Sequence, residues 1–301
     1  MIADKTAYDH IRSGGLGFVE VSRGLIAVSG KEAVQFLDGM ITNDVKTLAD
    51  GSQMLAAFPN AQGRLLAVVR VMRMGERFLV ETEEATREKV FQTLFRFTYA
   101  GDFFVEDLSD GYTYFEIFGS KDDLPIGDDT ITLRSEFSLD CFARPVDANA
   151  IGAHLTNAGA ATISEGLYQT LRIENGVPKF GVDMDETTIV PELGLQGMIS
   201  YTKGCYIGQE IIARIHFRGH VAKQLSGLMA ESEPQATGFL PGAELKSADG
   251  KNAGRINSMV YSPGLEKNIA LAYVRYDYLE EGTELTAGDQ LVNVKKLPFF
   301  K

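Results

Sequence analysis

Glycines break the last part of the chain, after Val221, into short runs. The runs between them are rich in β-branched, aromatic and small apolar residues, as in 260–261 and 270–274. Short strands separated by turn-forming glycines are typical of small β-barrels. We therefore predict a separate C-terminal β-barrel domain over residues 223–301. The glycines are Gly242, Gly250, Gly254, Gly264, Gly282 and Gly288.

The first 222 residues show a different pattern, in which helices and strands are mixed. Apolar residues at helical spacing alternate with strand-like runs, which indicates the α+β class. We expect two subdomains in residues 1–222, one of them a ferredoxin-like insert within about residues 50–150. The predicted helices span 31–40, 83–97, 150–158 and 164–175.

Composition limits which classes of partner the protein can bind and which cellular compartment suits it. The formal net charge of −12 disfavours binding to nucleic acid and to anionic membrane surfaces. No apolar run has the length needed to cross a bilayer, and the first residues do not read as a signal peptide. The two cysteines, Cys141 and Cys205, lie far apart, which suits a reducing compartment. We therefore expect a cytoplasmic protein without nucleic-acid or membrane partners.

Positive charge gathers locally in this acidic chain, between residues 203 and 223. Four basic residues there face a single acid, Glu210, and His216 and His220 lie in the same stretch. Such a run is either a solvated face or a docking patch for a small anionic ligand. The four basic residues are Lys203, Arg214, Arg218 and Lys223.

The most distinctive segment, Lys-Gly-Cys-Tyr-Ile-Gly-Gln-Glu, runs from residue 203 to 210 and contains Cys205. Gly204 and Gly208 bracket the cysteine, and glycines allow backbone angles that other residues avoid. A lysine two residues away, and a helix starting near Gln209, would both favour the thiolate. The pattern favours a functional thiol. The alternative is a free cysteine that packs as a small apolar residue.

Glu174 is the second informative residue. It shares one face of the helix predicted over 164–175 with Leu167 and Leu171. A carboxylate that ends an apolar stripe is buried or lines a cavity, and it then needs a hydrogen-bond donor. A heteroaromatic ring with adjacent N–H groups would supply two parallel donors. The alternative is a helix-end glutamate that reaches water or pairs with Arg172 or Lys179.

Motifs for other chemistries are absent from the sequence. There is no CxxC, HExxH or cysteine cluster, so a zinc or iron–sulfur site built from this chain alone is not expected. His216 and His220 have helical spacing, but Gly219 between them argues against a continuous helix. No GxGxxG, Walker or GxSxG motif is present.

Several segments, spread over nearly the whole chain, resemble one known family. They are 36–45, 171–178, 191–195, 203–210, and 254–258 with 270–274. This set resembles the folate-binding YgfZ family, within the wider fold family of the glycine-cleavage T-protein, an aminomethyltransferase. The octet Lys-Gly-Cys-Tyr-x-Gly-Gln-Glu is the specific part, because it separates YgfZ-like proteins from true T-proteins.

The resemblance implies a three-domain ring of the aminomethyltransferase folate-binding type, with tetrahydrofolate held in a central opening. By this resemblance Glu174 takes the N–H groups of the pterin, and the turn around Cys205 lines the same opening. We further infer that the charge near Arg214 and Arg218 attracts the glutamate tail of the folate. The expected folate contacts are Glu174, Lys203, Gly204, Tyr206, Gln209 and Arg214.

One departure from the T-protein pattern matters. In the T-protein a catalytic aspartate follows an Asn-x-x-Gly turn, which here is residues 60–63, and the aligned positions hold Ala67 and Val68. Neither side chain can accept a proton. Aminomethyl transfer by that mechanism is therefore not expected. The resemblance instead implies folate-dependent assembly or repair of iron–sulfur clusters, with Cys205 as the signature thiol.

Three hypotheses follow. The first is a tetrahydrofolate-binding protein that assists iron–sulfur enzymes or their assembly proteins. The second is a folate-dependent one-carbon transferase in which Cys205 or another group replaces the aspartate. The third is a binding module that holds no folate and docks a protein through its basic patch.

Overall fold

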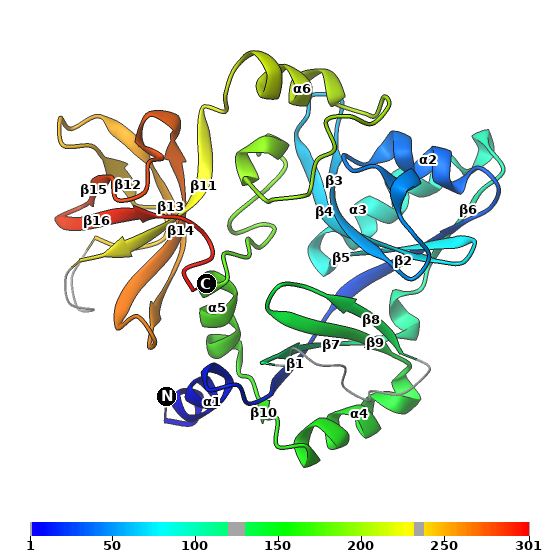
Figure 1. Cartoon of the computed structure of the whole chain (residues 1–301), viewed down its shortest axis with the longest axis horizontal. Coiled ribbons are helices and arrows are strands. Elements are labelled where there is room, and N and C mark those ends of the chain that lie inside the picture. Colours follow the sequence, from blue (N-terminus) through cyan, green and yellow to red (C-terminus); the bar gives the residue numbers. More distant parts are fainter. Residues whose placement is uncertain (1, 120–129, 232–237, 301) are drawn as a thin grey trace. The chain divides into compact units, whose positions relative to one another are not determined.

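The computed structural model describes residues 2–119, 130–231 and 238–300, and the chain forms two compact units (Figure 1). Unit 1 comprises Met1–Gln62, Leu66–Ser164 and Gln196–Gln209. Unit 2 comprises Gly63–Leu65, Glu165–Leu195 and Glu210–Lys301.

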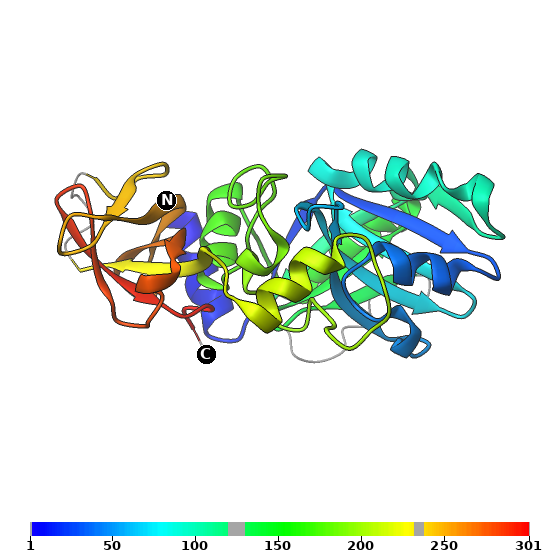
Figure 2. The same ribbon diagram turned by 90° about the horizontal axis from the view of Figure 1, so that it is seen from above.

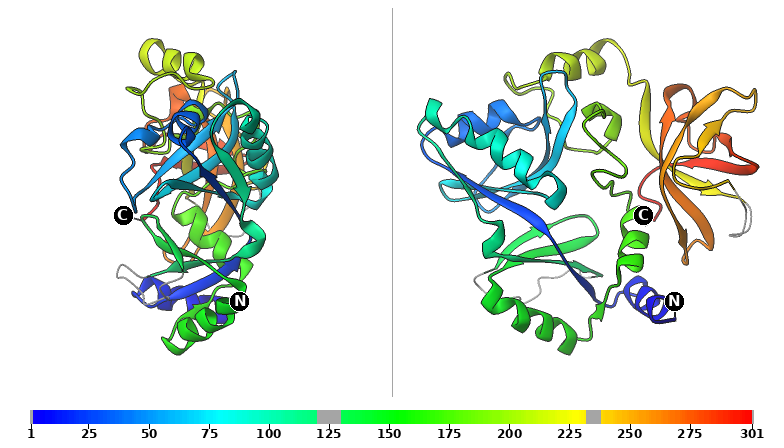
Figure 3. Two further views of the ribbon diagram at one scale, coloured as in Figure 1. Left: turned by 90° about the vertical axis from the view of Figure 1, so that its right-hand side faces the viewer. Right: turned by 180° about the vertical axis from the view of Figure 1, so that it is seen from behind.

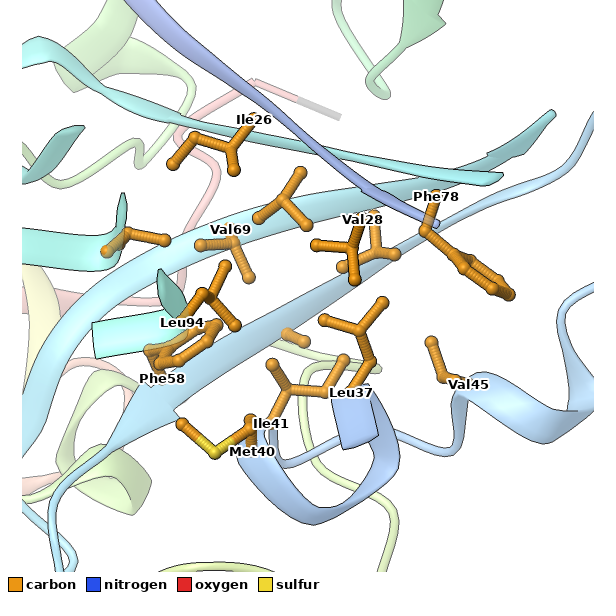
Figure 4. Packing of buried hydrophobic residues seen from close by; sticks show 14 of the residues in the cluster. Ile26, Val28, Leu37, Met40, Ile41, Val45, Phe58, Val69, Phe78 and Leu94 are labelled. Carbon is orange, nitrogen blue, oxygen red and sulfur yellow. The ribbon is translucent and has the colours of Figure 1, made fainter. Parts of the chain in front are cut away.

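The first sheet of unit 1 has five strands in the order β3, β4, β5, β2, β6. Helices α2 (Ala33–Met40) and α3 (Glu84–Phe95) contribute to the buried cluster on one face, where Leu37 packs with Phe58 and Val69 (Figure 4). The strands are β2 (Arg23–Ser29), β3 (Gln53–Pro59), β4 (Leu65–Met74), β5 (Arg77–Glu83) and β6 (Phe104–Asp107).

Strand β2 shows why this sheet is buried on both sides. Successive side chains of a strand point to opposite faces. Ile26 and Val28 join the cluster under the helices, whereas Leu25 and Ala27 join a second cluster with Tyr114 and other residues of the second sheet. The two sheets of unit 1 therefore pack face to face through alternate residues of β2.

The second sheet has five strands in the order β10, β1, β7, β9, β8, and only the β10–β1 pair is parallel among its described pairs. Helix α4 (Pro145–Asn157) packs on it through Ile151 and Leu155, and α1 (Ile2–Arg12) precedes β1. The strands are β1 (Gly17–Val21), β7 (Thr113–Phe118), β8 (Ile131–Arg134), β9 (Ser138–Ala143) and β10 (Ala161–Thr162).

Unit 2 is built around a closed six-stranded barrel in the order β11, β14, β13, β12, β15, β16, drawn in yellow to red in Figure 2. Side chains such as Leu228, Ile256 and Val292 fill its interior. The predicted C-terminal β-barrel is confirmed. Its strands are β11 (Lys223–Ala230), β12 (Glu244–Lys246), β13 (Asn252–Ser262), β14 (Lys267–Arg275), β15 (Glu284–Ala287) and β16 (Gln290–Lys295).

Helix α5 (Glu165–Glu174) packs on the barrel, because Ile173 shares a buried cluster with Leu225 and Leu271 (Figure 3). The helix ends at Glu174, and two residues later Gly176 has a φ of 71°, which favours glycine. The second long helix of unit 2 is α6 (Gln209–Arg218). The short 3-10 helices of the chain are η1 (Val45–Thr47), η2 (Thr98–Ala100), η3 (Ser109–Gly111), η4 (Val190–Leu193) and η5 (Tyr276–Tyr278).

Most predicted helices are present, but some elements escaped prediction. The expected helices over 31–40, 83–97 and 164–175 are α2, α3 and α5, whereas 150–158 is only the second half of α4. Helix α1 and strands β8 and β9 were not predicted. Strands β5 and β6 pair with β2, and β7 pairs with β1, and both β1 and β2 lie before residue 50. The ferredoxin-like insert within about residues 50–150 stays a prediction. The boundary between 1–222 and 223–301 stays a prediction.

Candidate functional site

Lys203 lies at the centre of the loop that carries Cys205. Its ammonium donates hydrogen bonds to the backbone carbonyls of Asp38, Ile41 and Asn43, at 2.6, 2.9 and 2.6 Å. The lysine side chain is fully buried, and an ammonium has three hydrogens to donate. Lys203 therefore anchors the loop, and no ammonium hydrogen remains for the folate contact that the sequence suggested.

The end of helix α2 explains this anchor. The last carbonyls of a helix have no partner inside the helix, and a cation is favourable there. The Asp38 carboxylate adds ion pairs to Lys203 at 3.1 Å and to Lys46 at 2.6 Å. Burial would raise the pKa of Asp38, but the bonds from Lys46 and Lys203 outweigh burial and lower it. Burial lowers the pKa of Lys203, against the opposing effect of Asp38.

Further hydrogen bonds join the same loop to the last turn of α2 and to the segment that follows it. The Thr42 hydroxyl donates to the Met198 carbonyl at 2.7 Å, and the Ile207 amide donates to the Gly39 carbonyl at 3.0 Å. The loop is therefore tied down on both sides of Lys203.

The residues that surround Cys205 have contrasting environments. Cys205 and Gly204 are exposed, whereas Tyr206 is buried. The Lys203 ammonium lies 5.1 Å from the centre of the Tyr206 ring, and burial raises the pKa of Tyr206 to about 12. Gln209 donates its side-chain amide to the Gly204 carbonyl at 3.2 Å. Cys205 is thus exposed on a loop whose backbone is held in place by the hydrogen bonds of Lys203 and Gln209.

The two glycines of the octet have different roles. Gly208 has a φ of 80°, which disfavours other residues. Gly204 has no such angle, and the nearest atom to a Cβ placed there would be the Lys46 Nζ, 4.0 Å away. The expectation that both glycines take strained angles is therefore right only for Gly208.

Glu174 is the last residue of α5 and is completely buried. Its Oε1 accepts a hydrogen bond from the Ser262 hydroxyl at 2.5 Å, and its backbone carbonyl accepts one from the Phe299 amide at 2.9 Å. Leu167 and Leu171 are buried on the same helix, as their spacing predicted. The buried carboxylate is thus bonded to the barrel strand β13.

The alternative partner suggested for Glu174, Arg172, is engaged elsewhere. Its guanidinium donates to the Asp183 carboxylate at 2.7 Å and to the Val177 carbonyl at 3.1 Å. Asp183 is completely buried and accepts a second bond, from the Lys179 amide, at 3.0 Å. This ion pair fixes the segment that follows α5.

The remaining candidates lie on α6, which begins at Gln209 as expected. Arg214 is exposed on this helix. The helix ends at Arg218, so His216 and His220 do not share one helix, and the His220 ring stacks on Tyr276 at 3.6 Å.

The two units divide the candidate residues between them. Unit 1 contains the octet up to Gln209, with Cys205 and its anchor, and unit 2 contains Glu174 and Arg214. A shared opening for Glu174 and Cys205 stays a prediction. Sequence reasoning missed Asp38 and Ser262 as partners of site residues, because neither lies near its partner in the sequence.

The described residues contain neither a membrane-spanning helix nor a metal-ligand cluster. No helix there is long and apolar enough to span a membrane. Within the same ranges, no group of three His, Cys, Asp or Glu side chains is placed to hold a metal ion. Cys141 is buried on β9, and burial raises the pKa of its thiol to about 12.

Two family models match the chain. The GCVT N-terminal domain matches residues 8–123, and the glycine cleavage T-protein C-terminal barrel domain matches residues 223–301. The crystal structure of the glycine cleavage system aminomethyltransferase T from Bartonella henselae has a TM-score of 0.83 at 20% identity, covering 94% of this chain and 86% of that one. The fold is therefore of the aminomethyltransferase type, as predicted.

Three curated proteins are similar over most of the chain. The iron-sulfur cluster assembly factor IBA57 homolog, mitochondrial, of Mycosarcoma maydis is 27% identical, covering 89% of this chain and 75% of that protein. The aminomethyltransferase of Rubrobacter xylanophilus is 28% identical, covering 99% and 86%. The tRNA-modifying protein YgfZ of Hamiltonella defensa is 26% identical, covering 69% and 68%. Together with the two matched domains, these relatives show that the chain belongs to the superfamily of YgfZ-like and glycine-cleavage T-protein-like proteins.

Proposed function

We propose that this protein binds tetrahydrofolate and assists the assembly or repair of iron–sulfur clusters in client enzymes. The name of one relative, an iron-sulfur cluster assembly factor, supports this class of function. The clients are iron–sulfur enzymes or assembly proteins, and the cluster is cargo.

The observation that carries the proposal is the exposed Cys205 on a loop anchored by Lys203. A thiolate is both a nucleophile and a ligand for iron, and it must be accessible for either purpose. The contrast with the buried Cys141 supports a role for Cys205 outside the core.

Glu174 fits a pterin by its chemistry. A buried carboxylate needs hydrogen-bond donors, and the adjacent N–H groups of a pterin are donors that two carboxylate oxygens can accept side by side. Gly204, Tyr206, Gln209 and Arg214 are the further proposed contacts. Tetrahydrofolate, when bound, supplies a reduced pterin that carries one-carbon units.

A second candidate function is one-carbon transfer. The Rubrobacter aminomethyltransferase, similar over 99% of this chain, favours it. Against it stands Ala67, at one of the two positions aligned with the T-protein aspartate, which is fully buried in the apolar core of unit 1. A side chain in that environment offers no proton acceptor.

The relative named as a tRNA-modifying protein suggests a link to RNA. A net charge of −12 makes direct RNA binding unfavourable.

Calorimetric titration with tetrahydrofolate tests the folate site. Glu174→Ala is expected to weaken binding by about a hundredfold, since a charged hydrogen-bond acceptor is lost. Cys205→Ala is expected to bind folate like the unmodified protein and to fail in restoring a cluster-dependent enzyme. Equal folate affinity for Glu174→Ala and the unmodified protein would contradict the assignment of Glu174 to the folate site. If the unmodified protein bound no folate at all, the third hypothesis, a protein-docking module without folate, would be favoured.

A turnover assay separates the two functions. Methylene-tetrahydrofolate formation from amine donors is expected to stay at background, because the T-protein aspartate is missing. Product above background that is lost in Cys205→Ala would favour the transferase.

A further inference from the structure

Ser262, at the end of β13, is buried completely and donates its hydroxyl hydrogen to Glu174 Oε1 at 2.5 Å. The backbone amide of Leu265 donates to the same hydroxyl oxygen at 3.2 Å. A serine hydroxyl has one hydrogen and can also accept. Because the amide occupies an acceptor position, the geometry directs the single hydrogen to the carboxylate.

This bond has a consequence for the orientation of Glu174. A hydroxyl that donates to a carboxylate oxygen fixes that oxygen as the acceptor of the bond. It also restricts the rotation of the carboxylate at the end of α5. The barrel thus contributes a side chain that holds Glu174 as an oriented acceptor within unit 2.

A second serine on the same strand provides a built-in comparison. Ser258 is also buried and donates to Asp183 Oδ1 at 2.5 Å. The other oxygen of Asp183 accepts from Arg172 and from the Lys179 amide. That carboxylate is therefore part of an internal ion pair. The two serines make the same bond, one to a structural acid and one to the acid proposed for the pterin.

We propose that Ser262 is a positioning residue for folate recognition, because its hydroxyl holds the Glu174 carboxylate oriented as a hydrogen-bond acceptor for the pterin N–H groups. The proposal rests on the proposed function. Through Ser262, the barrel would contribute to the choice of ligand as well as to the stability of unit 2.

Calorimetry with tetrahydrofolate compares Ser262→Ala with its control, Ser258→Ala. Ser262→Ala is expected to weaken binding about tenfold, the loss of one charged hydrogen bond. Ser258→Ala is expected to bind within about twofold of the unmodified protein, although both variants lose similar thermal stability. Ser262→Cys fills nearly the same space with a weak donor and is also expected to weaken folate binding. This variant replaces Ser262→Ala in the comparison if the alanine variant does not fold.

Ligand discrimination supplies a readout that a purely structural role would not move. The probe is a tetrahydrofolate analogue with a methyl group in place of the exocyclic amine of the pterin. The unmodified protein and Ser258→Ala are expected to prefer tetrahydrofolate to the same extent, whereas Ser262→Ala loses most of that preference. A loss of fold alone would weaken both ligands equally.

The outcomes separate this proposal from the proposed function. Ser262→Ala that matches Ser258→Ala in both affinity and discrimination overturns the role of Ser262, while the folate site stands if Glu174→Ala has lost binding. An unmodified protein that binds no folate, or a Glu174→Ala variant that binds normally, overturns both.

Discussion

The Cys205 loop in unit 1 and the end of α5 in unit 2 are each held by a buried basic residue, but the candidate functional residues that follow differ in exposure. In each, a buried basic residue stands two positions before the candidate functional residue, Lys203 before Cys205 and Arg172 before Glu174. Each basic residue is bonded to at least one backbone carbonyl and to a buried aspartate. Cys205, in the loop, is exposed, whereas Glu174, at the end of the helix, is completely buried.

The difference teaches how to interpret charged residues in a motif. Lys203 lies two residues before Cys205 in the octet, yet the hydrogens of its ammonium are donated to carbonyls inside the protein. A buried charge is retained only where partners compensate its desolvation. The identity of those partners, and not the proximity in sequence, decides whether a charge anchors the chain or meets a ligand.

Thiol labelling gives the largest expected contrast and tests the exposed loop. Cys205 is expected to react with a thiol reagent at least about a thousandfold faster than Cys141, because Cys141 needs the sheet to open. Mass spectrometry of the labelled peptides in the native protein measures both rates. Comparable rates would contradict the difference in burial on which the comparison depends.

The Arg172 anchor is tested by Arg172→Met. The change leaves the Asp183 charge buried after its ion pair is lost, so the free energy of unfolding should fall by about 4 kcal/mol. Urea unfolding followed by circular dichroism measures it. Arg275→Met, at an exposed arginine of the same unit, is the control and should change stability by less than about 0.5 kcal/mol.

The Lys203 anchor should be the weaker of the two. Lys203→Met is expected to cost about 3 kcal/mol, because Lys46 still compensates Asp38. The same unfolding experiment applies, with Lys31→Met at a 90% exposed lysine side chain as the control. If both lysine variants were equally stable, Lys203 would not be an anchor, and its candidacy as a folate contact would return.

The acid side of the Lys203 anchor has a pH signature. The pKa of Asp38 is lowered in the folded protein, so its stabilisation is present above the unfolded value of 3.8 and is lost as pH falls through the lower folded value. Asp38→Asn should therefore cost about 2 kcal/mol at pH 7 and progressively less below about pH 4. Unfolding curves at several pH values measure the difference. A difference that does not depend on pH would exclude the ionised carboxylate as its source.

Local patterns predicted much of the fold. Helices α2, α3 and α5 follow from apolar spacing, and the barrel follows from the glycine-broken strands after Val221. Strand β9 escaped because Asp140 interrupts its apolar pattern. Arg70 and Asp140 form an ion pair across the two sheets of unit 1, so burial of that aspartate becomes acceptable only after the sheets have packed.

The sequence by itself determined the α+β class and the barrel, and it singled out Cys205 and Glu174 as candidate functional residues, because spacing and motif are local properties. The tertiary structure alone decided the roles of Lys203, Asp38 and Ser262. Their partners are distant in the chain, 165 residues from Asp38 to Lys203 and 88 from Glu174 to Ser262. A hydrogen bond depends on distances in space, which a local pattern does not contain.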